Sequence, residues 1–107
     1  MDDPNARLVL PAAALAEACW TVDPGKSAIK SAASLLDAID ADRRISVAPL
    51  TATLVRLCHE SRMHVIREMH DRQIVATTLR LIESGEPAAL LTRDVNITQS
   101  ALVPVVW

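Results

Sequence analysis

The segment with the clearest indication of chemistry begins at Asp71 and ends at Asp94. Asp71 opens a predicted amphipathic helix, and Asp94 follows Thr92 and Arg93 directly after an apolar run at residues 88–91. That run predicts a strand, and ligands of open α/β sheets bind at the carboxyl ends of strands. Carboxylate oxygens are the ligands that Mg²⁺ and Mn²⁺ prefer. Each aspartate also has a plainer interpretation, since Asp71 suits a helix N-cap and Asp94 an Asx-turn in a loop.

The helix after Asp71 is predicted from a stripe of side chains spaced three and four apart. Its members are Ile74, Val75, Thr78, Leu79 and Ile82. Gly85 is expected to end the helix in a left-handed turn, and Pro87 prevents the helix from resuming. Residues 88–91 show no polar alternation, which favours a strand buried on both faces.

The remaining elements are predicted to alternate between strands and helices. We expect strands at residues 7–10, 45–47 and 102–106, and helices at residues 12–20, 27–41 and 51–62. Thr51 is the expected cap of the third of these helices, whose inward side chains are Leu54, Leu57 and Cys58. A turn is expected at residues 23–25, and a loop after Asp94. The alternation predicts an α/β fold with a short parallel sheet of about four strands.

Composition places the chain among single globular domains. The 107 residues are 50% hydrophobic and 22% charged, with a net charge of −2. With this net charge the sequence does not predict a broad basic surface for nucleic acid, so RNA binding would depend on local arginines or on bound metal. No apolar run approaches the ~20 residues that span a bilayer, and the first residues are acidic where a signal peptide is basic. We therefore predict a cytoplasmic protein without a membrane segment.

Several motifs together resemble a known family. The runs HDRQIVATTL, LLTRD and VPVVW, with a glycine between the first two, resemble the C-terminal half of PIN domains. The run LVLPAAALAEA is similar to the second strand of that family and the acid-bearing helix after it. The resemblance covers residues 7–107 and is strongest to the VapC toxins, which are metal-dependent ribonucleases. It implies a three-layer fold, with residues 1–107 forming a single PIN-like domain.

The resemblance also implies a site. Glu17, Asp71 and Asp94 match three of the family's four acidic positions, and would be catalytic ligands of Mg²⁺ or Mn²⁺. Thr92 matches a hydroxyl that orients a metal-bound water, so it joins the catalytic set. Arg72 and Arg93 would contact RNA phosphate or restrain the acids. The implied activity is hydrolysis of RNA by a metal-activated water, and the implied partner is an antitoxin protein. Without the resemblance, Glu17 would be read as a solvated residue.

One part of the family pattern has no counterpart. Such domains open with an apolar strand ending in aspartate, which lies between the second and fourth strands of the sheet. Only MDDPNA precedes Arg7, and neither Asp2 nor Asp3 follows an apolar strand. The neighbouring strands could then pair directly, a second copy could fill the gap, or the chain could be a fragment. We favour a homo-oligomer, because unpaired apolar edges call for one. The alternative function is an inactive PIN-like remnant that dimerises or binds a partner. A third possibility is that the match is accidental and the chain is an unrelated small α/β domain.

The remaining reactive side chains predict little chemistry. Cys19 and Cys58 lack metal-type spacing and are interpreted as buried free thiols. His59, His64 and His70 are five and six apart, which puts no pair on one helical face. Trp20 and Trp107 are expected to be core or interface anchors. With no Phe or Tyr, the chain offers little aromatic surface for stacking bases.

Overall fold

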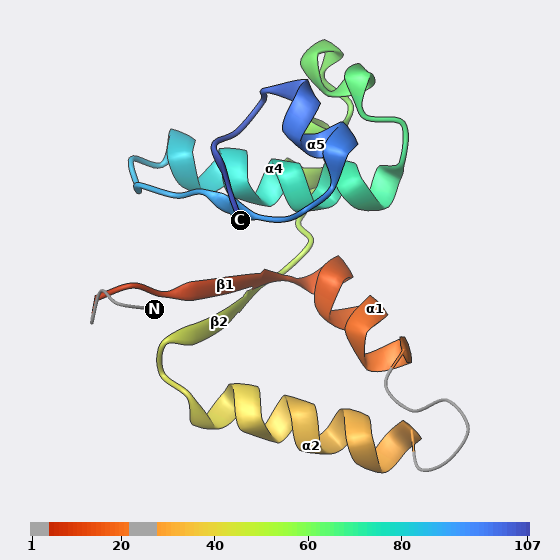
Figure 1. Ribbon diagram of the computed structural model, residues 1–107, viewed down its shortest axis with the longest axis vertical. Helices are drawn as coiled ribbons and strands as arrows, with labels where there is room; N and C mark the ends of the chain where they lie inside the picture. Colours follow the sequence, from red (N-terminus) through yellow and green to blue (C-terminus); the bar gives the residue numbers. More distant parts are fainter. Residues whose placement is uncertain (1–4, 22–27) are drawn as a thin grey trace. The chain divides into compact units, whose positions relative to one another are not determined.

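The structure is a computed structural model that describes residues 5–21 and 28–107 (Figure 1). The expected turn at residues 23–25 and the first residue of the helix expected at residues 27–41 lie outside the described residues. Helices and parallel strands alternate along the chain, which confirms the α/β class. Contacts divide the chain into two compact units, Met1–Pro49 (unit 1) and Leu50–Trp107 (unit 2).

Unit 1 is built on two parallel strands and two helices. β1 (Leu8–Pro11) runs into α1 (Ala12–Thr21), and α2 (Ala28–Ala41) precedes β2 (Ile45–Ala48). Leu8 pairs with Ile45, and the Leu8 N–H donates to the Arg44 carbonyl at 2.8 Å. Parallel neighbours need a long crossover connection, which α1 and α2 supply here. The predicted strands and helices of this unit are confirmed to within one or two residues, which is the usual uncertainty of element ends.

Burial in unit 1 is slight. Ile39 is 8% exposed, and no other hydrophobic side chain described in this unit is as well buried. The turn before β2 is held by polar contacts instead. The Asp42 carboxylate accepts hydrogen bonds from the Arg44 backbone N–H at 2.9 Å and from its guanidinium at 3.1 Å. The Arg44 hydrogen bonds lower the pKa of Asp42. Both side chains are at the surface, so this pair fixes the turn geometry and contributes little stability.

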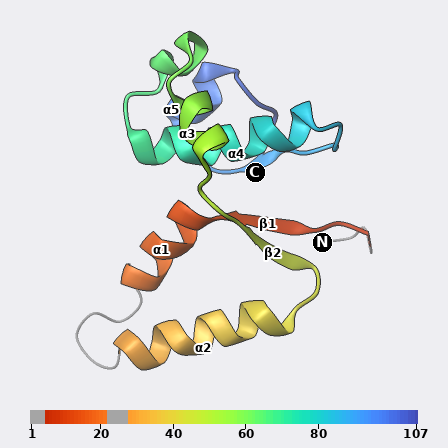
Figure 2. The ribbon, with the colours of Figure 1, turned by 180° about the vertical axis from the view of Figure 1, so that it is seen from behind.

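Unit 2 contains the remaining elements. They are α3 (Ala52–Cys58), the 3₁₀ helix η1 (Ser61–Val65), α4 (Met69–Glu83), β3 (Leu90–Leu91), α5 (Val95–Ser100) and β4 (Val105–Val106). Figures 1 and 2, which view the chain from opposite sides, show α4 between α3 and α5. The Thr51 hydroxyl caps α3 by accepting the Leu54 N–H at 3.2 Å, as predicted. The helix expected at residues 51–62 is shorter, because η1 replaces its last turn.

One hydrophobic cluster forms the core of unit 2. It joins α3, η1, α4, α5 and the segment before β4, and consists of Leu54, Leu57, Cys58, Met63, Ile66, Val75, Ala76, Leu79, Ile97 and Val103. Two threonines of α4 are also buried. The Thr77 hydroxyl donates to the Gln73 carbonyl at 2.8 Å, and that of Thr78 donates to the Ile74 carbonyl at 3.4 Å. These bonds to the preceding turn satisfy both hydroxyls, so the helix buries them without an unpaired polar group.

The end of α4 confirms the role predicted for Gly85. Gly85 has a φ of +94°, its N–H donates to the Ile82 carbonyl at 3.0 Å, and the Glu86 N–H donates to the Leu81 carbonyl at 3.1 Å. This pair of bonds is a Schellman motif, in which a left-handed residue closes the helix and satisfies its last carbonyls. The chain then turns back toward β3.

Three expectations about the C-terminal part are wrong. The strand expected at residues 102–106 is only Val105–Val106. The strand expected at residues 88–91 is only Leu90–Leu91, and Leu91 is 57% exposed instead of being buried on both faces. Within the described residues its sheet has two strands, β3 and β4, so strand pairing there covers little of Leu91. The loop expected after Asp94 is the helix α5, whose Ile97 is anchored in the core.

The four strands form two separate parallel sheets. β1 pairs with β2, and β3 pairs with β4, with Leu90 opposite Val105 and Leu91 opposite Val106. Among the residues that the structure describes, no ladder joins β1 to β3. Parallel pairing is thus as predicted, while the single sheet of about four strands is replaced by two pairs.

Candidate functional site

Asp71 lies in the first turn of α4, but it is not the cap. The helix begins at Met69 with Glu68 as its N-cap, so the interpretation of Asp71 as N-cap is wrong. A carboxylate in the first turn still interacts favourably with the positive end of the helix dipole. The side chain is half-buried and lies one turn before Val75, which is completely buried. Asp71 therefore borders the core of unit 2.

Asp94 is the N-cap of α5. Its Oδ1 accepts the Ile97 N–H at 3.0 Å, and its own N–H donates to Thr92 Oγ1 at 3.1 Å. The Asx-turn interpretation identified the right chemistry, a carboxylate that binds a backbone N–H, but missed the helix that follows. The cap holds this half-buried carboxylate in one orientation. Because Thr92 Oγ1 accepts that bond, the Thr92 hydroxyl proton stays available for another acceptor.

The core connects the surroundings of the two aspartates. Val75 is four residues after Asp71, and Ile97 is three residues after Asp94, so each aspartate lies one helical turn from its buried neighbour. Val75 and Ile97 belong to the same buried cluster. Both aspartates therefore lie on helices that are anchored in one packed core.

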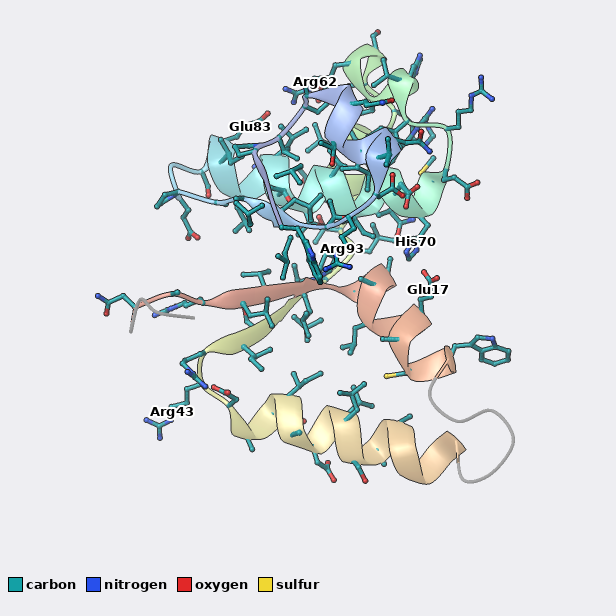
Figure 3. The ribbon with its side chains drawn as sticks, viewed as in Figure 1. Glu17, Arg43, Arg62, His70, Glu83 and Arg93 are labelled. Atoms are coloured by element: carbon teal, nitrogen blue, oxygen red, sulfur yellow. The ribbon has the colours of Figure 1, made fainter. Side chains whose placement is uncertain are left out.

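Glu17 belongs to unit 1. It is exposed on α1, as its interpretation as a solvated residue predicts (Figure 3). Asp71 and Asp94 belong to unit 2. Within residues 5–21 and 28–107, no three His, Cys, Asp or Glu side chains are grouped so that they could hold a metal ion.

Arg72 is engaged with the protein backbone. Its Nε donates to the Ile66 carbonyl, and its Nη1 approaches the Cys58 carbonyl at 3.5 Å. The half-buried guanidinium thus ties the end of α3 and the end of η1 to the first turn of α4. A second, exposed contact joins η1 to the last turn of α4, because the Arg62 guanidinium donates to the Glu83 carboxylate at 2.6 Å (Figure 3).

Arg93 stacks on an indole ring. Its guanidinium carbon lies 4.1 Å from the centre of the Trp107 ring. Trp107 is 70% exposed and Trp20 is 83% exposed, so the expectation that either is a core residue is wrong. Sequence reasoning missed this pair, although the spacing offered a signal. Arg93 follows β3 by two residues and Trp107 follows β4 directly, and β3 and β4 are parallel neighbours.

The cysteines and histidines do not form a site within the described residues. Both cysteines are free thiols; Cys58 is 1% exposed and Cys19 is half-buried. Burial raises the pKa of the Cys58 thiol, although the positive charge of Arg72 opposes the shift. This confirms the interpretation of Cys58 as a buried thiol. His59 and His64 are exposed.

Comparisons with known proteins leave the family open. No protein-family model matches the chain, and neither the curated proteins nor the solved structures contain a match. None of the described helices has both the length and the apolar character needed to cross a membrane.

Proposed function

We propose that the chain is a PIN-like, divalent-metal-dependent endoribonuclease of the toxin type. One observation carries this proposal: the pairing of the strands. In the resembled fold the opening strand lies between the second and fourth strands. By the resemblance, β1 and β3 correspond to those two strands, and within the described residues β1 pairs with β2 and β3 pairs with β4. Two parallel pairs with this connectivity support a PIN-like strand order. The proposal includes the three-layer fold of that family.

Asp71, Asp94 and Glu17 are the proposed metal ligands. The donor chemistry fits Mg²⁺ or Mn²⁺, because all three are carboxylates. The fit is incomplete in geometry, because the described residues contain no group of three acids that could hold a metal. A bound ion would activate a water molecule and neutralise charge on the phosphate. The Asp94 carboxylate is oriented for this role by the Ile97 N–H, and the Thr92 hydroxyl can donate its proton to an oxygen of substrate or water.

Calorimetric titration with Mn²⁺ tests the metal site. Asp94→Asn removes the charge but keeps a good N-cap, so α5 should stay intact. We expect saturable binding to the wild-type chain, and at least tenfold weaker binding to Asp94→Asn (about 1.4 kcal/mol). Glu86→Gln is the matched control, because Glu86 is exposed and lies outside the proposed ligands. Equal binding by all three proteins, or no binding by folded wild type, would refute the proposal.

A second candidate function is a non-catalytic module that dimerises or binds a partner such as an antitoxin. It is favoured by the register partners Leu91 and Val106, which are 57% and 52% exposed. Side chains directly opposite each other project from the same face of a sheet, so these two form a continuous apolar surface. Sedimentation velocity across a concentration series distinguishes the candidates. Self-association that Leu91→Ser abolishes, in a protein without Mn²⁺ binding, would favour the module.

A further inference from the structure

The carboxyl ends of β3 and β4 carry a cationic side chain stacked on an exposed aromatic ring. Arg93 follows β3, Trp107 follows β4, and the guanidinium carbon lies 4.1 Å from the ring centre. Trp107 is 70% exposed. Exposing a large indole to water is unfavourable, and such a residue often marks a binding surface.

Among the described residues, no carboxylate forms an ion pair with Arg93. Within residues 5–21 and 28–107, the arginines with a carboxylate inside 4.0 Å are Arg44 and Arg62, and Arg93 is not among them. Stacking occupies the flat face of a guanidinium and leaves the N–H groups at its edge able to donate. An anion can therefore bind at that edge while the stack persists.

We propose that Arg93 and Trp107 form a site that binds one nucleotide of single-stranded RNA. The free part of the indole stacks on a nucleobase, and the Arg93 edge binds a phosphate. This inference rests on the proposed function and deepens it, because Asp94 is the next residue after Arg93. A phosphate bound at Arg93 places the RNA backbone beside one of the proposed metal ligands.

The chemistry of the pair favours RNA over an apolar protein surface. A protein that covered the indole with apolar side chains would also bury the adjacent guanidinium, and an unpaired buried charge is costly. A nucleotide supplies both parts that the pair lacks, a flat π-face and an anion. Duplex RNA fits poorly because its bases are stacked inside the helix, whereas single strands can splay a base out.

Intrinsic fluorescence provides a direct test. The chain has two Trp and no Tyr, so Trp20→Phe leaves Trp107 as the sole strong emitter. Oligouridylate is added in excess chelator, so that no metal-dependent cleavage occurs. We expect saturable quenching of Trp107. In an anisotropy assay with a labelled oligouridylate, Trp107→Ala and Arg93→Gln should each weaken binding about tenfold, as expected for a lost stacking partner. Duplex RNA should compete poorly.

Arg43→Gln is the matched control, because Arg43 is an exposed arginine of unit 1 (Figure 3). It should leave the affinity unchanged. Two results would overturn the inference: affinity that is equally insensitive to Trp107→Ala and Arg93→Gln, or quenching that depends on protein concentration alone, which would assign the indole to a protein interface. The readouts separate the two proposals. Metal-free RNA binding through Trp107 without Mn²⁺ binding would sustain this inference and refute the nuclease, and the reverse pattern would refute this inference alone.

Discussion

The Nε of Arg72 donates a hydrogen bond to the backbone carbonyl of Ile66, six residues earlier in the chain. The same guanidinium approaches the Cys58 carbonyl, so one charged side chain holds the last carbonyl of α3 and the carbonyl after η1 beside the first turn of α4. Hydrogen bonds to charged donors contribute more than neutral ones. Arg72 therefore has a structural role next to Asp71, whether or not it also contacts substrate.

Replacing Arg72 should destabilise unit 2. Arg72→Met leaves the Ile66 carbonyl without its charged donor, and we expect a loss of about 2 kcal/mol in the free energy of unfolding. Urea unfolding measures the loss. Arg80→Met is the control, because Arg80 is an exposed arginine of the same helix, and it should change stability by less than about 0.5 kcal/mol. Equal stability of the two variants would contradict the structural role of Arg72.

Replacing Asp94 should separate its capping role from its charge. Asp94→Ala removes the acceptor of the Ile97 N–H and should destabilise the protein by about 1 kcal/mol. Asp94→Asn retains an acceptor and should cost much less. Thermal unfolding of the two variants tests this difference. If they are equally unstable, the carboxylate charge and not the cap stabilises α5.

Gly85 should resist substitution because of its backbone conformation. A Cβ at this position would meet no atom within 4 Å, so any cost of Gly85→Ala comes from the φ of +94° and not from a clash. We expect a loss of about 1 kcal/mol, and a smaller loss for Gly85→Asn, because Asn tolerates the left-handed region. Chemical denaturation gives both values, and an Ala variant as stable as wild type would show that the turn can relax.

Ala101 offers the converse test. It occupies the left-handed region with a φ of 55°, where a residue with a Cβ is strained. Ala101→Gly should relieve that strain but increases the freedom of the unfolded chain, so we expect a net stabilisation of about 0.5 kcal/mol. Differential scanning calorimetry detects this as a higher Tm. A lower Tm would mean that the strain is smaller than the entropic cost.

Cys58 should make stability depend on pH under alkaline conditions. Burial raises the pKa of its thiol above the ordinary value of 9.0, so the folded state holds the proton more tightly than the unfolded state. The resulting stability is complete below the unfolded-state pKa and is lost as pH rises through the folded-state pKa. The free energy of unfolding of wild type should thus fall more steeply above about pH 8.5 than that of Cys58→Ala. Parallel curves for the two proteins would contradict this assignment.

The parts of the fold set by local chemistry were predictable. Thr51, Gly85 and the stripe on α4 behave as their residue types and spacing indicate, because caps, left-handed turns and helical faces depend on a few neighbouring residues. Leu54, Leu57 and Cys58 were likewise expected to point inward, and they do.

The parts set by distant contacts were not predictable. The apolar run before Thr92 reads as a buried strand, but Leu91 is exposed, and within the described residues its sheet has two strands. α5 was missed because its residues are weak helix formers, and its stability comes from the Asp94 cap and from Ile97 in the core. In the candidate site, the backbone contact of Asp94 was predictable from the residue type. The stacking of Arg93 on Trp107 was not, because it requires β3 and β4 to be neighbours.

The uneven burial of the two units has a consequence for proteolysis. The core cluster lies wholly within residues 54–103, whereas Ile39 is the best-buried hydrophobic side chain described in unit 1. Segments with few buried contacts open at a lower free-energy cost than the core does. Cleavage by a protease should therefore begin within unit 1, and a fragment beginning near Leu50 should persist longest.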